Sequence, residues 1–85
     1  MPEPVGDEIL TAGEWTARLA SALGVDPPSD DEREALLGLA GVAAHASERA
    51  AAPITCWLVA RAGVAPADAL AIAEGLAFKV EREAP

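Results

Sequence analysis

The sequence predicts an all-α protein, a compact four-helix bundle with short connections. Three observations predict it. Apolar residues recur at spacings of three and four, a Ser or Thr followed three residues later by Glu marks two helix starts, and Gly or Pro separates the segments. No segment alternates between apolar and polar residues as a half-buried strand does.

The first helix is expected at residues 12–23. Thr11 and Glu14 form a capping box, in which each side chain accepts a hydrogen bond from an otherwise unpaired amide at the helix start. Gly24 suits the left-handed residue that ends many helices. The apolar residues at helical spacing are Trp15, Leu19, Ala22 and Leu23.

The second helix is expected at residues 30–49, after a second capping box formed by Ser29 and Glu32. Its apolar stripe comprises Leu36, Leu39, Ala40, Ala43 and Ser47. Gly38 and Gly41 lie inside this helix, where glycine costs up to about 1 kcal/mol relative to alanine. Close approach of a neighbouring helix backbone would explain both glycines.

Two further helices are expected at residues 53–62 and 66–82. Pro53 suits the first position of a helix, because the amide it lacks would be unpaired there anyway. A kink inside a longer helix is the alternative. Gly63 ends the third helix and Pro66 opens the fourth. The inner face of the fourth comprises Leu70, Ala73, Leu76, Ala77 and Val80.

The chain of 85 residues is expected to form a single helical domain at 8–82, between a mobile tail at 1–7 and a short tail at 83–85. The hydrophobic fraction is 52%, but much of it is alanine, and only three residues are aromatic. Such a thin core favours packing through small residues and also self-association.

The net charge of −8 argues against nucleic acid and anionic membranes as partners, since both need a positive protein surface. The single cysteine, Cys56, excludes an internal disulfide and fits a reducing compartment. The acidic start of the sequence lacks the basic segment of a signal peptide, and no apolar stretch is long enough to span a bilayer. We therefore expect a cytoplasmic protein.

Enzymatic chemistry is not expected. His45 and Cys56, each the only residue of its type, are too few for a zinc site, so we expect no metal and no cofactor. Ser47, Thr55 or Cys56 as a nucleophile with His45 as its base would also need a third orienting group and an oxyanion hole, for which the sequence has no motif. No glycine-rich phosphate loop is present. We expect no catalytic residue.

The joint between the second and third helices is the candidate binding site. His45 and Arg49 are four residues apart, so one continuous helix would place them on one face. Pro53 and Thr55 mark the next helix start, where free amides attract anions. With Glu48, these residues could hold a carboxylate, a phosphate or a partner's acidic side chain. Alternatively, Arg49 pairs with a carboxylate of this chain, His45 caps or packs, and Thr55 caps the third helix.

Trp15 and Trp57 are the candidate interface residues, because tryptophan is enriched at the energetic centres of protein interfaces. The alternative is that each fills a helical core that has few other large side chains.

Several of these residues also carry a family resemblance over about residues 14–78. The first helix fits a Trp-x-x-x-Leu-x-x-x-Leu-Gly pattern, and acidic residues open the second. The matching positions are Trp15, Leu19, Leu23, Gly24, Asp30-Asp31, Ala44-His45, Glu48-Arg49, Ala52-Pro53-Ile54-Thr55 and Leu58-Val59. The chain thereby resembles a small all-helical domain of unknown function from high-GC bacteria, found alone or fused to molybdenum-cofactor guanylyltransferase. Cys56 departs from the pattern, which has threonine or a similar residue there, and Ala60 stands where it has glycine.

The resemblance implies an association with molybdenum-cofactor biosynthesis and no known catalytic residues. We therefore expect a non-enzymatic interaction or regulatory module whose partner is the guanylyltransferase or a client molybdoenzyme. A small anion- or phosphate-binding domain and a homodimeric structural domain are the alternatives.

Overall fold

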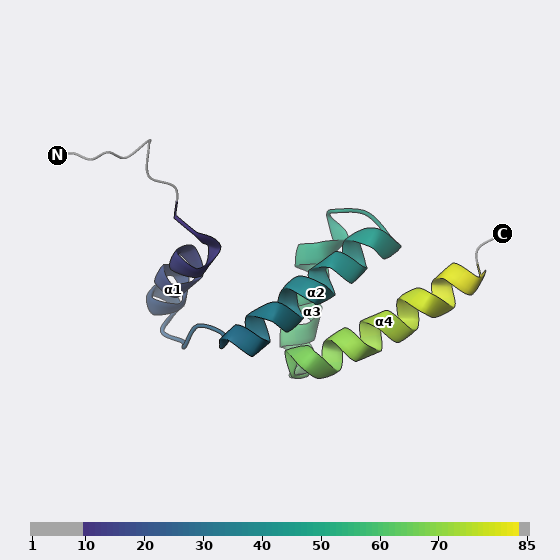
Figure 1. The fold of residues 1–85 in the computed structure, drawn as a ribbon. Helices are drawn as coiled ribbons and strands as arrows, with labels where there is room; N and C mark the ends of the chain where they lie inside the picture. Colours follow the sequence, from purple (N-terminus) through teal and green to yellow (C-terminus); the bar gives the residue numbers. More distant parts are fainter. Residues whose placement is uncertain (1–9, 84–85) are drawn as a thin grey trace.

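The computed structural model describes residues 10–83, which form four α-helices and no strand (Figure 1). The helices are α1 (Ala12–Leu23), α2 (Asp30–Ala46), α3 (Ala51–Ala62) and α4 (Pro66–Glu83). The expected all-α, four-helix class is confirmed. The expected tail at residues 1–7 lies outside the described residues, and Glu83, expected in the second tail, is the last residue of α4.

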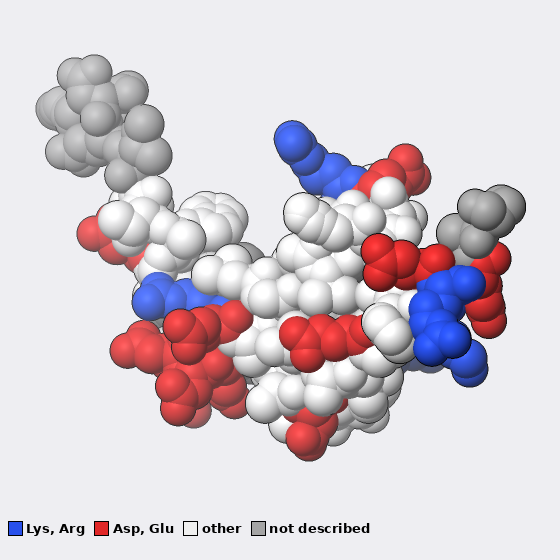
Figure 2. All heavy atoms as spheres, turned by 45° about the vertical axis from the view of Figure 1, so that its right-hand side comes forward, with Lys and Arg blue, Asp and Glu red and all other residues white. Residues whose placement is uncertain are grey.

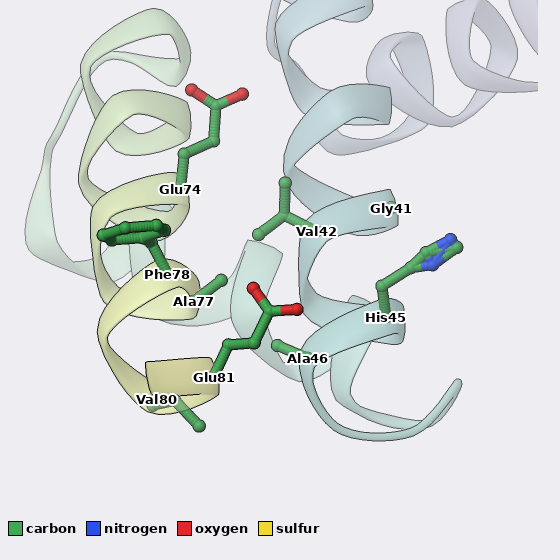
Figure 3. A pocket seen from close by; sticks show the side chains of 9 residues that line it. All are labelled: Gly41, Val42, His45, Ala46, Glu74, Ala77, Phe78, Val80 and Glu81. Atoms are coloured by element: carbon green, nitrogen blue, oxygen red, sulfur yellow. The ribbon is translucent and has the colours of Figure 1, made fainter. Parts of the chain in front are cut away.

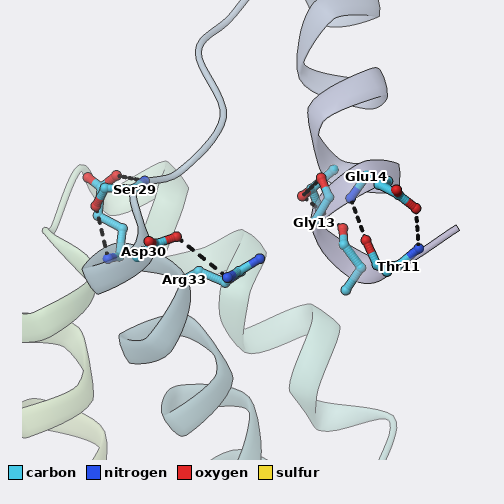
Figure 4. A network of polar contacts seen from close by, with 9 residues as sticks. Thr11, Gly13, Glu14, Ser29, Asp30 and Arg33 are labelled. Carbon is cyan, nitrogen blue, oxygen red and sulfur yellow. Dashed lines mark hydrogen bonds and ion pairs between the residues drawn. The ribbon is translucent and has the colours of Figure 1, made fainter.

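Capping boxes open the first two helices, as the sequence predicts (Figure 4). The Glu14 amide donates to the Thr11 hydroxyl over 3.1 Å, while the Thr11 amide donates to the Glu14 carboxylate over 2.8 Å. Ser29 and Glu32 repeat both bonds at the same distances. Gly24, with φ 75°, ends α1 in the left-handed conformation that glycine adopts without steric cost.

The boundary between α2 and α3 differs from the prediction. The second helix ends at Ala46 rather than Arg49, and α3 begins at Ala51 rather than Pro53. The physical reason is that the carbonyls of Glu48 and Arg49 accept hydrogen bonds from the first two amides of α3, so these residues belong to the next turn. Pro53 is tolerated as the third residue of α3, because amides in the first turn have no intrahelical partner.

The second helix is the centre of the fold, because both α3 and α4 pack against it. Leu39 of α2 is fully buried there, and Ala69 of α4 is 4% exposed. A Cβ atom added to Gly38 would lie 3.4 Å from both δ carbons of Leu70, so α4 meets this glycine through a side chain at van der Waals distance. The expected close approach of a helix backbone is therefore wrong for Gly38. It is also wrong for Gly41, because no described residue would lie within 4 Å of its Cβ.

The first helix stands apart from α2, α3 and α4 (Figure 1). It makes no packing contact comparable to those of α2 with α3 and α4. The close packing expected from the short connections therefore describes α2–α4 and does not extend to α1.

Large apolar side chains remain on the surface in unusual number. Thirteen described residues of this kind are exposed, from Leu10 at 37% to Leu23 and Leu37 at 67%. Acidic side chains gather around the start of α2, and single acidic side chains interrupt the uncharged surface over the middle of the face shown in Figure 2. Within residues 10–83, no helix is both long enough and apolar enough to cross a membrane.

Candidate functional site

The joint between α2 and α3 exposes most of the residues that the sequence singles out. His45 lies in the last turn of α2, and Glu48 and Arg49 lie between the helices; all three are exposed. Pro53 is exposed in the first turn of α3, and Thr55 is half-buried two residues later. The structure thus places the five candidate residues along one short segment.

His45 and Arg49 do not share a helix face, so that expectation is wrong. The helix ends at Ala46, and Ser47 at its end has φ −136° and ψ −103°, which is outside helical geometry. The spacing of four residues loses its meaning once the chain leaves the helix. The alternative of an internal ion pair is also unsupported, since the ion pair within residues 10–83 joins Arg33 and Asp30 and does not involve Arg49.

The start of α3 offers few donors to an anion. The amides of Ala51 and Ala52 donate to the carbonyls of Glu48 and Arg49 over 2.9 and 3.1 Å, and Pro53 has no amide hydrogen. Ala50 precedes the helix without any side-chain cap, so Thr55 does not cap α3. The first-turn donors of α3 are therefore used or missing, so an anion here would depend on the side chains and amides of the joint that precedes the helix.

The outer face of α3 presents a group of apolar side chains, which we call the α3 face: Ile54, Trp57 and Leu58. Their exposed fractions are 60%, 58% and 54%. The guanidinium of Arg61 lies over the Trp57 ring, 5.2 Å from its centroid, in a cation–π contact. Trp57 therefore does not fill the core of this chain, and neither does Trp15 on α1, which is 56% exposed.

A groove of about 640 Å³ lies between the second half of α2 and the second half of α4 (Figure 3). His45 is on its α2 wall, and its α4 wall carries Glu74, Phe78 and Glu81. Sequence reasoning did not identify these three residues of α4. The available signal was Phe78, the only phenylalanine, which falls outside the apolar stripe expected for this helix.

The described residues do not gather three His, Cys, Asp or Glu side chains in a way that could hold a metal ion. Cys56 is half-buried in α3. What the geometry does define is a small helical protein with an open arrangement. Its apolar surfaces lie on α1, on α3, in the α2–α4 groove and, at Ile72 and Leu76, on α4 outside the groove.

The family model for a domain of unknown function, DUF6457, matches residues 7–84. The chain belongs to this family, and the match extends beyond both ends of the segment over which the sequence showed a resemblance. No curated protein and no solved structure matches the chain.

Proposed function

We propose that this protein is a non-enzymatic interaction or regulatory module that docks on an enzyme of molybdenum-cofactor biosynthesis. Its partner in this proposal is the molybdenum-cofactor guanylyltransferase or a client molybdoenzyme. The link to the cofactor is drawn from the resemblance to a domain of high-GC bacteria that also occurs fused to the guanylyltransferase. A fused domain commonly acts on its neighbour, which favours docking over an independent reaction.

The observation that carries the docking proposal is the exposure of the α3 face. Trp57 is 58% exposed between Ile54 and Leu58, and interface energy concentrates on such aromatic anchors surrounded by apolar contacts. A monomeric protein gains nothing from keeping three large apolar side chains in water on one short helix. The α3 face therefore has the character of an interface centre.

Basic side chains flank this face in an otherwise acidic chain. Arg49 precedes the first turn of α3, and Arg61 lies in its last turn. The chain has six Lys and Arg residues against fourteen Asp and Glu residues, so one cation at each end of this apolar helix stands out. Acidic groups on the partner would complement them, and such charges chiefly set the rate and orientation of association.

The test is direct binding between the purified full chain and the guanylyltransferase from the same organism, measured by biolayer interferometry. The client molybdoenzyme is measured in parallel. We expect Trp57→Ala to weaken binding at least tenfold, since truncation of a central tryptophan removes an anchor. Arg49→Glu is expected to slow association.

Ile54 and Ile72 provide a matched control pair. Both are exposed isoleucines, at 60% and 64%, but only Ile54 belongs to the α3 face. Ile54→Asp should weaken binding and Ile72→Asp should leave it unchanged. The proposal is wrong if the wild-type chain binds neither enzyme, or if the two aspartate variants behave alike.

A further inference from the structure

The first helix carries an apolar stripe that has no partner in its own chain. Trp15, Leu19 and Leu23 are 56%, 42% and 67% exposed. The helix faces the start of α2 with another side, because a Cβ added to Gly13 would lie 2.8 Å from Nη1 of Arg33 (Figure 4). Trp15 is two residues from Gly13, about 200° around the helix, so its side of α1 points away from α2.

The connection to α2 keeps the helix in this position. Gly24 turns the chain in the left-handed conformation, with φ 75°. Pro27 and Pro28 follow, and each ring fixes its own φ and restricts the residue before it. A flexible linker would let the stripe fold back onto α2–α4, whereas this connection holds α1 as an extended arm (Figure 1).

The groove between α2 and α4 is the surface that would receive the apolar stripe of α1. Its walls include small or apolar residues, among them Val42, Ala46 and Ala77, whose side chains lie between the two helices in Figure 3. Gly41 on its α2 wall has open space over it, although a glycine inside a helix is unfavourable. A bulky side chain from outside the α2–α4 unit would use that space.

The stripe and the groove match in length and in charge. From Trp15 to Leu23 the stripe runs about 12 Å along α1, and the α4 wall from Glu74 to Glu81 runs about 10 Å. Both ends of that wall are carboxylates, and no Lys or Arg is among the described residues that line the groove. Arg18 lies one turn after Trp15, at the edge of the stripe, where it would meet these carboxylates.

We propose that α1 of one copy of this protein occupies the α2–α4 groove of a second copy, and that the second copy returns its own α1 in the same way. The two copies then form a reciprocally exchanged dimer with two-fold symmetry, in which one association covers both surfaces on both chains. This assembly is separate from docking through the α3 face, which the exchange leaves free.

The charges and the exposed side chains support a second copy as the occupant. A second copy brings both the arm and the groove, so Arg18 of each copy would meet the groove carboxylates Glu74 and Glu81 of the other. The same association would cover the stripe of each copy, whose Trp15, Leu19 and Leu23 are exposed in the single chain.

Sedimentation velocity across a dilution series tests the proposal. The wild-type chain should sediment at twice the 8.6 kDa mass of one chain and dissociate on dilution. Leu19→Glu places a charge in the stripe, and Ala46→Arg places a bulky cation in the groove at an exposed helix end that favours positive charge. Each variant alone should be monomeric, with at least a tenfold weaker association. Trp57→Ala, the control from the α3 face, should remain dimeric.

Mixing the two defective variants gives the sharper result. The Ala46→Arg chain keeps an intact arm, and the Leu19→Glu chain keeps an intact groove, so the mixture should form a dimer through one of the two exchanges. Circular dichroism must show wild-type helix content for each variant; if Leu19→Glu loses helix, Trp15→Ala replaces it as the arm variant.

Three outcomes overturn the proposal. The wild-type chain could be monomeric at all concentrations, which would assign the groove to its own folded-back arm or to another protein. The two variants could remain dimeric, or their mixture could stay monomeric. None of these outcomes affects binding of the guanylyltransferase through Trp57, so failure of the dimer and failure of the proposed function are distinguishable.

Discussion

Gly38 of α2 lies directly under Leu70 of α4: a Cβ added to the glycine would be 3.4 Å from both δ carbons of the leucine. This contact belongs to the packing of α4 on α2, the more extensive of the two packings that α2 makes. A Cβ added to Gly75, in the middle of α4, would have no described residue within 4 Å. The two glycines therefore separate the effect of helix propensity from the effect of packing.

Replacement of each glycine by alanine should give different gains in stability. Gly75→Ala should raise the free energy of unfolding by about 0.5–1 kcal/mol, the usual gain inside a helix. Gly38→Ala should gain less, because its methyl group would meet both δ carbons of Leu70 at 3.4 Å, the lower limit of ordinary van der Waals contact. Urea unfolding at one protein concentration measures both values, and an equal gain from the two substitutions would show that Leu70 does not pack there.

Leu39 should be the most sensitive position of the chain. It is the one large side chain that is fully buried among the described residues, and truncation of such a leucine costs about 2–5 kcal/mol. Leu39→Ala should therefore unfold much of this small protein. Leu37→Ala is the control on the same helix: Leu37 is 67% exposed, and its truncation should change the free energy of unfolding by less than about 0.5 kcal/mol. Thermal unfolding followed by circular dichroism compares the two variants, and similar losses would contradict the burial of Leu39.

The two capping boxes have the same geometry, but the loss of each should destabilise a different part of the chain. Ser29→Ala removes the cap of the central helix and should destabilise α2–α4 by about 1 kcal/mol. Thr11→Ala should fray α1 alone, because α1 makes no packing contact comparable to those of α2 with α3 and α4. Amide hydrogen exchange in dilute solution, where the chain is monomeric, distinguishes the two effects. Faster exchange of α2–α4 amides in Thr11→Ala would show that α1 supports them.

Local chemistry explains why the helix starts were predictable. Thr11 with Glu14 and Ser29 with Glu32 satisfy amides within three residues of themselves, so their hydrogen bonds do not depend on the rest of the fold. The end of α2 had no such signal. Ala46 is followed by residues that are all compatible with a helix, and the competition for the Glu48 and Arg49 carbonyls becomes visible only in three dimensions.

The sequence predicted which segment holds the candidate site, but not how its side chains are arranged. The sequence identified His45 and Arg49 but placed them on one helix face, because it extended α2 by three residues. The sequence also showed an apolar stripe on α1 without indicating that no helix covers it. Which helices pair depends on contacts between residues far apart in the sequence. The α2–α4 groove, and the positions of Glu74 and Glu81 on its α4 wall, therefore followed only from the structure.

The two tryptophans should report separately on association. In a Trp57→Phe variant, Trp15 is the only tryptophan and lies on the stripe that the proposed dimer buries. Its emission should shift to shorter wavelength as protein concentration rises, because burial removes water from the indole ring. In a Trp15→Phe variant, where phenylalanine keeps the stripe apolar, Trp57 should emit at the same wavelength throughout, because the α3 face stays in solvent. A shift confined to Trp57 would move the self-association surface from α1 to α3, and the same face could not then remain free for an enzyme partner.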